Sequence, residues 1–223
     1  MAKDEAPIFF DAIARRYDRV YALSGDESKK RIADVLFLIR AKQRVLVLGV
    51  GTGRELSALQ DAGHVLHGID CSREMIALCN RRARPVPIAL GDFWEPLPFE
   101  EGAFDAVIAL HGTLAHPPTD LAVPLLLSEV ARVLSAGGVF VAEVPHADYL
   151  AHLSHASEAV DNTRALRADG EDGFVHTDRV SGASIRGRVF SMKRWEDWLQ
   201  PHFEPKVSAL GAVEALVVGR LGK

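Results

Sequence analysis

Short apolar runs alternate with helical segments between residues 44 and 145, and this alternation restricts the fold more than any other feature of the chain. Five runs read as strands: "RVLVLGV", "HVLHGID", "VPIAL", "FDAVIAL" and "GGVFVAEV". Between them, "ELSALQDAG" suits a short helix, Ser72 can cap another, and residues 121–134 carry apolar side chains at core spacing. Strands that are joined through helices run parallel and are covered on both faces. The sequence therefore predicts a doubly wound α/β fold.

The segments on either side complete this prediction. Phe10 to Val20 present one apolar helical face, and Asp26 can cap the helix that follows, so residues 8–40 are expected to be helical. Residues 146–190 are polar and rich in turns, with a hairpin expected around Ser181 and Gly182. This region reads as an insertion in a single domain that spans residues 1–223.

The end of the chain predicts one more helix and two strands. Ser191 can cap the helix, and apolar runs follow near 205–211 and 213–220. Only a tight "GA" separates these two runs, which forces them to be antiparallel. We therefore expect a seven-stranded sheet that is mostly parallel and has an antiparallel last strand.

Composition and charge narrow the class of partner. The 223 residues include 48% apolar side chains, and the net charge is -4 with no cluster of lysine and arginine. A nucleic acid is therefore a disfavoured partner. No apolar run approaches the ~20 residues that cross a bilayer, and the N-terminus lacks the apolar core of a signal peptide. We expect a cytoplasmic protein without a membrane anchor, either a monomer or a homodimer.

Two cysteines, Cys71 and Cys79, are expected on one helix, too far apart for a disulfide and too few for a zinc site. We expect both to be reduced, and Cys71 is a candidate for a pocket wall because Asp70 precedes it. In "HADYLAHLSH", His146 and two further histidines would have to converge to hold a metal ion, and we expect no metal site.

Three glycines, Gly49, Gly51 and Gly53, follow directly after the first predicted strand. Without Cβ atoms the backbone can turn sharply and let a ligand approach the main chain, while the next helix offers amide groups to an anion. The alternative is a tight turn that only packs a helix on a strand. Arg54 lies where a nicotinamide dinucleotide site requires glycine or alanine, which counts against a dinucleotide.

Two aspartates end neighbouring strands beside this turn. Asp70 ends the second strand, where its carboxylate can accept hydrogen bonds from both hydroxyls of a ribose, and Asp92 ends the third strand in the same way. The alternative role for each is a helix cap or a turn former. Because ligands of open α/β sheets bind at the carboxyl ends of the strands, the turn and the aspartates together predict a nucleoside site.

Four segments in this order resemble the motifs of the class I S-adenosylmethionine-dependent methyltransferases: "VLVLGVGTGRE", "GIDCSREMI", "GDFWEPLPFEEGAFDAVIAL" and "LLSEVARVLSAGGVFVAEV". The N-terminal "FFDAIARRYDRVYALSGD" is similar to the leading helix of the small-molecule branch, of the methyltransferase domain 11/25 type, to which quinone-biosynthesis methyltransferases are related. The resemblance implies methyl transfer from S-adenosylmethionine to a small molecule, which leaves S-adenosylhomocysteine. The helices of residues 8–40 and the insertion at 146–190 would then form a lid over the acceptor pocket.

The resemblance also implies roles for single residues, beginning with those that hold the methionine and ribose portions of the cofactor. Gly49, Gly51 and Gly53 would line the methionine portion. Asp70 would bind the ribose hydroxyls, and Tyr17 would lie near the cofactor.

A second set of residues would hold the adenine. Cys71 and Met75 would flank the ring, Asp92 would accept a hydrogen bond from its exocyclic amine, and Phe93 would pack on it.

A third set would surround the reacting atoms. Ala109 and Leu110 would border the sulfonium. If the acceptor atom carries a proton, His111 is the best candidate for a general base because it follows the fourth strand. An ordinary polar loop residue is the alternative for His111, and His116 and His146 are weaker candidates at the same edge.

Val47 departs from the family pattern, which usually has an acidic residue two positions before the first glycine to hold the cofactor's amino group. Either main-chain carbonyls near residue 109 replace it or the affinity is weaker, so a cofactor-binding protein without turnover is an alternative. A nucleic-acid methyltransferase is a further alternative, disfavoured because "ALHGTLAHPP" replaces the Asn/Asp-Pro-Pro-aromatic motif of enzymes that methylate amino groups of bases.

Overall fold

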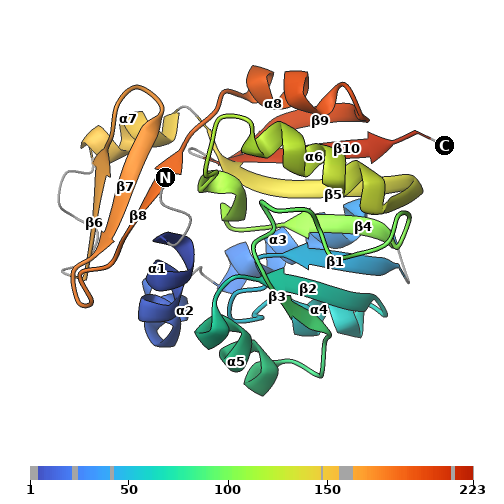
Figure 1. The fold of residues 1–223 in the computed structure, drawn as a ribbon, viewed down its shortest axis with the longest axis horizontal. Helices are drawn as coiled ribbons and strands as arrows, with labels where there is room; N and C mark the ends of the chain where they lie inside the picture. Colours follow the sequence, from blue (N-terminus) through green and yellow to red (C-terminus); the bar gives the residue numbers. More distant parts are fainter. Residues whose placement is uncertain are drawn as a thin grey trace.

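The computed structural model describes residues 5–21, 25–40, 43–146, 148–155, 163–211 and 214–222, which form two β-sheets with surrounding helices (Figure 1). The larger sheet has seven strands: β1 Arg44–Leu48, β2 Val65–Asp70, β3 Ile88–Leu90, β4 Phe104–Ala109, β5 Leu134–Pro145, β9 Phe203–Leu210 and β10 Glu214–Leu221. Their order across the sheet is β3-β2-β1-β4-β5-β10-β9.

The pairing of these strands confirms the predicted sheet. β1 runs parallel to β2 and β4, and the pairs β2–β3 and β4–β5 are also parallel. β10 is antiparallel to both β5 and β9. The last strand therefore inserts between β5 and β9, so that β9, most of whose side chains are exposed, becomes the edge.

Helices cover both faces of the larger sheet because its central strands are apolar on both sides. α3 Gly25–Leu38 and α4 Leu56–Asp61 pack on one face, and α6 Ala122–Val133 and α8 Met192–Leu199 pack on the other. α5 Arg73–Arg82 packs beside β2 and β3. In Figure 1, α6 lies in front of the sheet and α3 lies behind it. The doubly wound arrangement is thus confirmed.

Two helix caps follow the sequence prediction, and two other predictions need correction. Ser191 caps α8 by accepting a hydrogen bond from the Arg194 N–H, and Ser72 caps α5 by accepting from the Met75 N–H. Because α5 begins only after Ser72, the placement of Cys71 inside that helix was wrong, although both cysteines are free thiols as expected. α3 already includes Asp26 in its first turn, so that residue is not a cap.

The N-terminal segment is broken into three short elements: α1 Glu5–Ile13, a 3₁₀ turn η1 Ala14–Arg16 and α2 Tyr17–Val20. The single helical face expected from Phe10 to Val20 is therefore interrupted. Within α1, Phe9 is 1% exposed, whereas Phe10 is only partly buried.

The insertion forms a second, antiparallel sheet of three strands, β6 Arg164–Ala168, β7 Gly173–Asp178 and β8 Ser184–Arg188. The hairpin predicted around Ser181 and Gly182 is confirmed as the turn between β7 and β8. β6 and the helix α7 Asp148–His155 have no counterpart in the sequence prediction, which took this region as turns. β8 packs against α1, so the second sheet and the N-terminal helices lie side by side (Figure 1).

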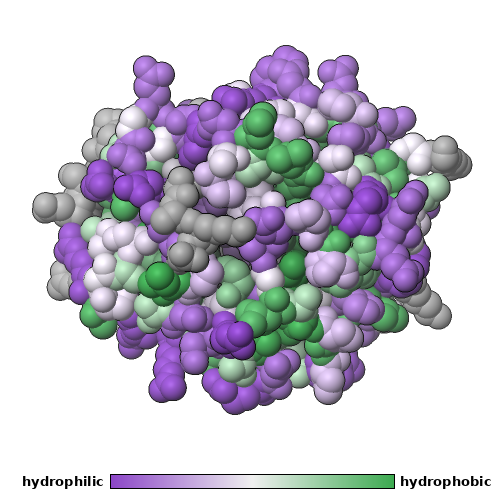
Figure 2. Space-filling model, viewed as in Figure 1, coloured by the Kyte–Doolittle hydropathy of each residue, from purple (hydrophilic) through white to green (hydrophobic). Residues whose placement is uncertain are grey.

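The surface is mostly hydrophilic, with apolar side chains in small separate groups on the face that Figure 2 shows. Within the described ranges, no helix combines the length and the apolar character needed to cross a bilayer.

Candidate functional site

A cavity lies at the carboxyl ends of the central parallel strands, where an open α/β sheet binds its ligands. It brings together nine of the twelve predicted site residues: Tyr17, Gly49, Gly51, Asp70, Cys71, Met75, Asp92, Phe93 and His111. Its remaining walls come from residues that the sequence did not indicate as site residues, apart from His116, a weaker candidate: Ala6, Phe9, Phe10, Tyr21, Trp94, Gly112, Thr113 and His116. The N-terminal helices thus close the side of the cavity opposite the strand ends.

Some of the unpredicted wall residues had a signal in the sequence. Tyr21 follows Tyr17 by one helical turn, which places both on the same face, and Trp94 directly follows Phe93. Phe9 and Ala6 had none, because only the packing of α1 across the strand ends brings them there.

Asp70 is the most constrained polar group of the cavity. It is 6% exposed, and its carboxylate accepts hydrogen bonds from the Gly51 N–H and the Ser72 N–H, each at 2.8 Å. Burial raises the pKa of the Asp70 carboxyl, and these amide hydrogen bonds oppose the rise. A carboxylate offers about four acceptor positions, so two amides leave acceptor capacity for hydroxyl groups of a ligand.

The three glycines of the turn have different surroundings, although all have positive φ angles, +66° at Gly49, +53° at Gly51 and +73° at Gly53. A Cβ atom on Gly49 would lie 2.7 Å from the Thr113 side chain, whereas one on Gly51 would meet no atom within 4 Å. A Cβ atom on Gly53 would lie 2.6 Å from the Cys79 Sγ. Gly53 does not line the cavity; it allows α5 to approach the turn.

Two other predicted residues lie behind the cavity wall. Ala109 is fully buried in β4 and Leu110 is 7% exposed, and neither lines the cavity. The Leu110 carbonyl accepts hydrogen bonds from the Thr113 N–H at 3.2 Å and from the Thr113 hydroxyl at 2.7 Å. Because both lone pairs of this carbonyl are engaged, it is a poor replacement for the acid missing at Val47.

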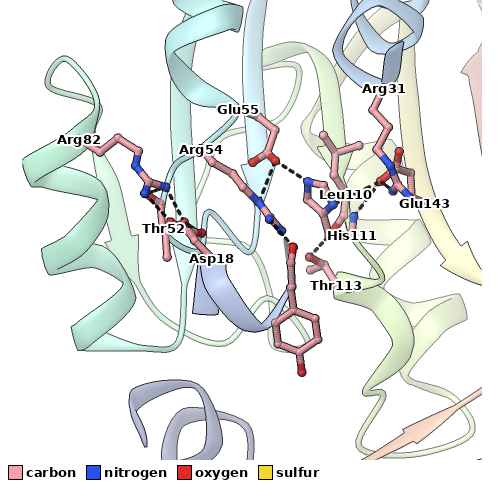
Figure 3. A network of polar contacts seen from close by, with 11 residues as sticks. Asp18, Arg31, Thr52, Arg54, Glu55, Arg82, Leu110, His111, Thr113 and Glu143 are labelled. Atoms are coloured by element: carbon pink, nitrogen blue, oxygen red, sulfur yellow. Dashed lines mark hydrogen bonds and ion pairs between the residues drawn. The ribbon is translucent and has the colours of Figure 1, made fainter. Parts of the chain in front are cut away.

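Val47 itself is 7% exposed and belongs to the apolar core beneath α3 and α4. Carboxylates nevertheless lie close to the end of β4. Glu143 on β5 is 2% exposed, and its carboxylate accepts hydrogen bonds from the His111 main-chain N–H at 2.9 Å and from Arg31 at 2.7 Å (Figure 3).

His111 is held from two sides. Its Nε2 hydrogen-bonds to the Glu55 carboxylate, which also pairs with Arg54 at 3.1 Å (Figure 3). Its backbone has a φ of +55°, a left-handed conformation that a non-glycine residue rarely adopts and that marks a constrained position. The Glu143 contact to its N–H stabilises this conformation, and its Nδ1 lies 4.0 Å from the same carboxylate.

Aromatic and sulfur groups form the less polar part of the cavity. Burial raises the pKa of Tyr17 to about 12 and that of the Cys71 thiol to about 12, so both groups are neutral at physiological pH. Phe93 is buried and packs on Trp94 with ring centroids 5.0 Å apart. Met75 is 1% exposed and packs with the N-terminal helices.

The other histidines differ in how they relate to the cavity. His116 lines it, and its Nδ1 hydrogen-bonds to the Arg186 carbonyl at 2.8 Å, while burial lowers its pKa. His146 is buried outside the cavity, and its Nδ1 accepts from the Asp148 N–H at 3.2 Å. Among the described residues, no three histidine, cysteine or acidic side chains are grouped so that they could hold a metal ion. The side chains of His152 and His155 lie outside the described part of the chain.

Comparison with known proteins finds methyltransferases that are similar to this chain. Residues 45–138 match the family described as "Methyltransferase domain". A demethylmenaquinone methyltransferase from Beutenbergia cavernae is 36% identical over 135 residues, which cover 59% of this chain and 54% of that protein. The chain thus spans about half the length of this curated relative.

Solved structures extend the similarity over nearly the whole chain. The CcbJ methyltransferase from Streptomyces caelestis superimposes with a TM-score of 0.77 at 21% identity, over 99% of this chain and 100% of that one. DhpI in complex with SAH gives a TM-score of 0.71 at 22% identity, over 98% of this chain and 96% of that one. At these identities the similarity shows the fold alone.

Proposed function

We propose that this chain is a class I S-adenosylmethionine-dependent methyltransferase that transfers a methyl group to a small-molecule acceptor. The observation that carries the proposal is the convergence of Asp70, Asp92 and the Gly49–Gly51 turn on one cavity at the carboxyl ends of the strands. The family match and the demethylmenaquinone methyltransferase relative support methyl transfer to a small molecule.

The residues of the cavity fit the proposed cofactor. Gly51 leaves open space beside the turn, so a ligand can approach the main chain there. Asp70 retains acceptor capacity for the ribose hydroxyls, and Asp92 lies in the same cavity for the exocyclic amine of the adenine. Gly49 would adjoin the methionine portion. When bound, S-adenosylmethionine supplies an electrophilic methyl group on its sulfonium.

Other wall residues provide the apolar part of the cofactor site in this proposal. Cys71 and Met75 flank the adenine, and Phe93 packs on it. Tyr17 closes the cavity from α2. Gly53, Ala109 and Leu110 act from behind the wall, by holding the turn and the end of β4 in place.

His111 is our candidate for the general base, and Glu55 is the residue that positions it. A hydrogen bond from Nε2 to Glu55 fixes the ring and leaves Nδ1 as the nitrogen that can accept a proton. Much of the rate acceleration in such a transfer comes from alignment and exclusion of water. The lid that we propose from the N-terminal helices and the insertion would supply that exclusion.

The test is calorimetry with S-adenosylmethionine and S-adenosylhomocysteine, followed by a methyl-release assay on a panel of metabolites. We expect both nucleosides to bind and at least one metabolite to be methylated. Absence of nucleoside binding would contradict the proposal. NADH is the control ligand and should not bind, since Arg54 replaces the third small residue of a dinucleotide site.

A cofactor-binding protein without turnover is the second candidate, and the apolar Val47 at the usual acidic position favours it. Binding of both nucleosides without methyl release on any metabolite would support this candidate. A nucleic-acid acceptor remains disfavoured by the net charge of -4. The cytoplasm and a monomeric or homodimeric state remain our predictions for its location and assembly.

A further inference from the structure

A second hollow adjoins the cofactor cavity and shares three wall residues with it, Tyr17, Tyr21 and His111. The shared residues include the candidate base and the two tyrosines of the N-terminal segment. A molecule in this hollow would therefore contact the same side chains that close the cofactor cavity. The part of a methyl acceptor that does not react could therefore bind in this hollow.

Three arginines also line this hollow, and two of them are neutralised by the protein. Arg31 pairs with Glu143 at 2.7 Å and with Glu214. Arg54 pairs with Glu55 at 3.1 Å. The positive charges of these two guanidinium groups are therefore balanced by carboxylates of the protein, without an anionic ligand.

Arg164, the first residue of β6, differs from both. Its Nε is buried and has no hydrogen-bond partner among the residues that the structure describes. Across those same residues, no carboxylate lies within ion-pair distance of its guanidinium group. A buried donor on a charged group without a partner is costly, and among the described residues the Arg164 Nε lacks a partner.

Two neighbouring side chains of the second sheet and the N-terminal segment lie near Arg164 without neutralising it. Its guanidinium carbon lies 5.3 Å from the centroid of the Tyr21 ring, within the range of a cation–π contact. The Tyr21 hydroxyl is engaged with the His176 Nδ1 at 2.6 Å. Burial lowers the pKa of His176 to about 4, and the nearby Arg164 charge contributes to this shift; a histidine ring offers Arg164 no negative charge in either protonation state.

We propose that Arg164 binds an anionic group of the methyl acceptor, a carboxylate or a phosphate, in the hollow beside the cofactor cavity. A planar guanidinium binds both oxygens of such a group through parallel hydrogen bonds. The acceptor would place its anionic end at Arg164 and its reacting atom near His111. This inference rests on the proposed methyltransferase function, and it adds a class of substrate that the comparisons do not supply.

The test measures the binding of matched fragments by calorimetry at saturating S-adenosylhomocysteine. Benzoate and benzamide have nearly the same shape and differ in charge. We expect benzoate to bind about tenfold more tightly than benzamide, the effect of one charge-assisted hydrogen-bond pair. Arg164→Gln should abolish the difference, and Arg164→Lys should retain part of it. Inorganic phosphate as a third probe distinguishes a phosphate site from a carboxylate site.

The matched control is Arg167→Gln, because Arg167 lies on the same strand with its side chain 66% exposed. This variant should keep the preference for benzoate. The proposal is overturned if wild-type protein binds benzoate no better than benzamide, or if Arg164→Gln leaves the preference unchanged. Binding of S-adenosylhomocysteine is also measured in each protein. A wild-type protein that does not bind S-adenosylhomocysteine would contradict the proposed methyltransferase function, so failure of that function is distinguishable from failure of the Arg164 proposal.

Discussion

The two sides of the cofactor cavity are built in different ways. On the strand side, contacts join residues that are close in sequence, such as the Gly51 N–H and the Asp70 carboxylate, 19 positions apart. On the N-terminal side, contacts join the N-terminal segment to β7: Arg16 binds Asp178 across 162 positions, and Tyr21 binds His176 across 155. The strand side therefore follows from local motifs, whereas the N-terminal side depends on how distant segments pack.

One buried carboxylate on each side, Asp70 and Asp178, illustrates how the partners of a carboxylate decide whether it can also bind a ligand. Asp70 is held by main-chain amides, and burial raises its pKa. Asp178 is held by the Arg16 guanidinium at 2.8 and 2.9 Å, and this partner and the Ser181 hydrogen bonds lower its pKa to about 2. The Arg16 guanidinium occupies both carboxylate oxygens of Asp178, so this contact joins β7 to the N-terminal segment. Amide partners leave acceptor positions open, so Asp70 can bind a ligand.

Asp70→Asn should have the largest effect. An amide side chain presents only one acceptor oxygen, so either the Gly51 or the Ser72 N–H loses its partner and the ribose loses a charged acceptor. We expect S-adenosylhomocysteine to bind about 100-fold more weakly by calorimetry. Asp105→Asn is the matched control, because Asp105 pairs with Arg44 away from the cavity. Unchanged affinity in Asp70→Asn would mean that this carboxylate does not contact the cofactor.

The next largest effect concerns His176 on the N-terminal side of the cavity, which should make the free energy of unfolding depend on pH. Burial lowers its pKa from 6.5 to about 4 in the folded protein. Between these values the unfolded chain binds a proton that the folded protein does not, so the free energy of unfolding should decrease as the pH falls through this interval. The contribution of His176 is about 3 kcal/mol in total.

The measurement is denaturant unfolding of wild type and His176→Gln at several pH values between 7 and 4. Asp178 contributes in the same direction only at lower pH, since its pKa falls from 3.8 to about 2. The variant should lose stability less steeply than the wild type above pH 4. The exposed His202 provides the control substitution His202→Gln, which should leave the slope unchanged. Equal slopes for wild type and His176→Gln would contradict the explanation.

The smallest expected effect is the difference in stability loss between alanine substitutions at Gly53 and Gly51. Gly53→Ala introduces a left-handed alanine and a contact 2.6 Å from the Cys79 Sγ, and we expect a loss of about 2 kcal/mol in stability. Gly51→Ala meets open space and should cost about 1 kcal/mol from its φ angle alone. Its methyl group enters the cavity, so it should weaken S-adenosylhomocysteine binding.

Adding Cys79→Ala to Gly53→Ala removes the close contact and should recover part of the stability. Thermal unfolding and calorimetry on the four proteins separate the two roles. If Gly53→Ala weakened cofactor binding as much as Gly51→Ala while leaving stability intact, Gly53 would belong to the cofactor site directly.

Much of the strand side of the cavity was predictable because hydrophobic periodicity and short motifs depend on residues that are close together in the sequence. An apolar run buried on both faces ends where the chain needs a turn, so Gly49 and Asp70 had to meet at one edge of the sheet. Prediction failed at β6 and α7, whose sequence is polar and lacks clear periodicity. It also missed Ala6 and Phe9, since the path of α1 is set by contacts with β8 and α5.

The sequence by itself determined the seven-stranded doubly wound sheet, the glycine turn and the aspartates at the strand ends, because each depends on residues within one strand–turn–helix unit. Only the tertiary structure decided how the cavity is closed, how Glu55 and Glu143 hold His111 and where Arg164 lies. These contacts join side chains that are tens to more than a hundred positions apart. Local periodicity contains no information about such pairs, which form only when the packed elements bring complementary charge and shape together.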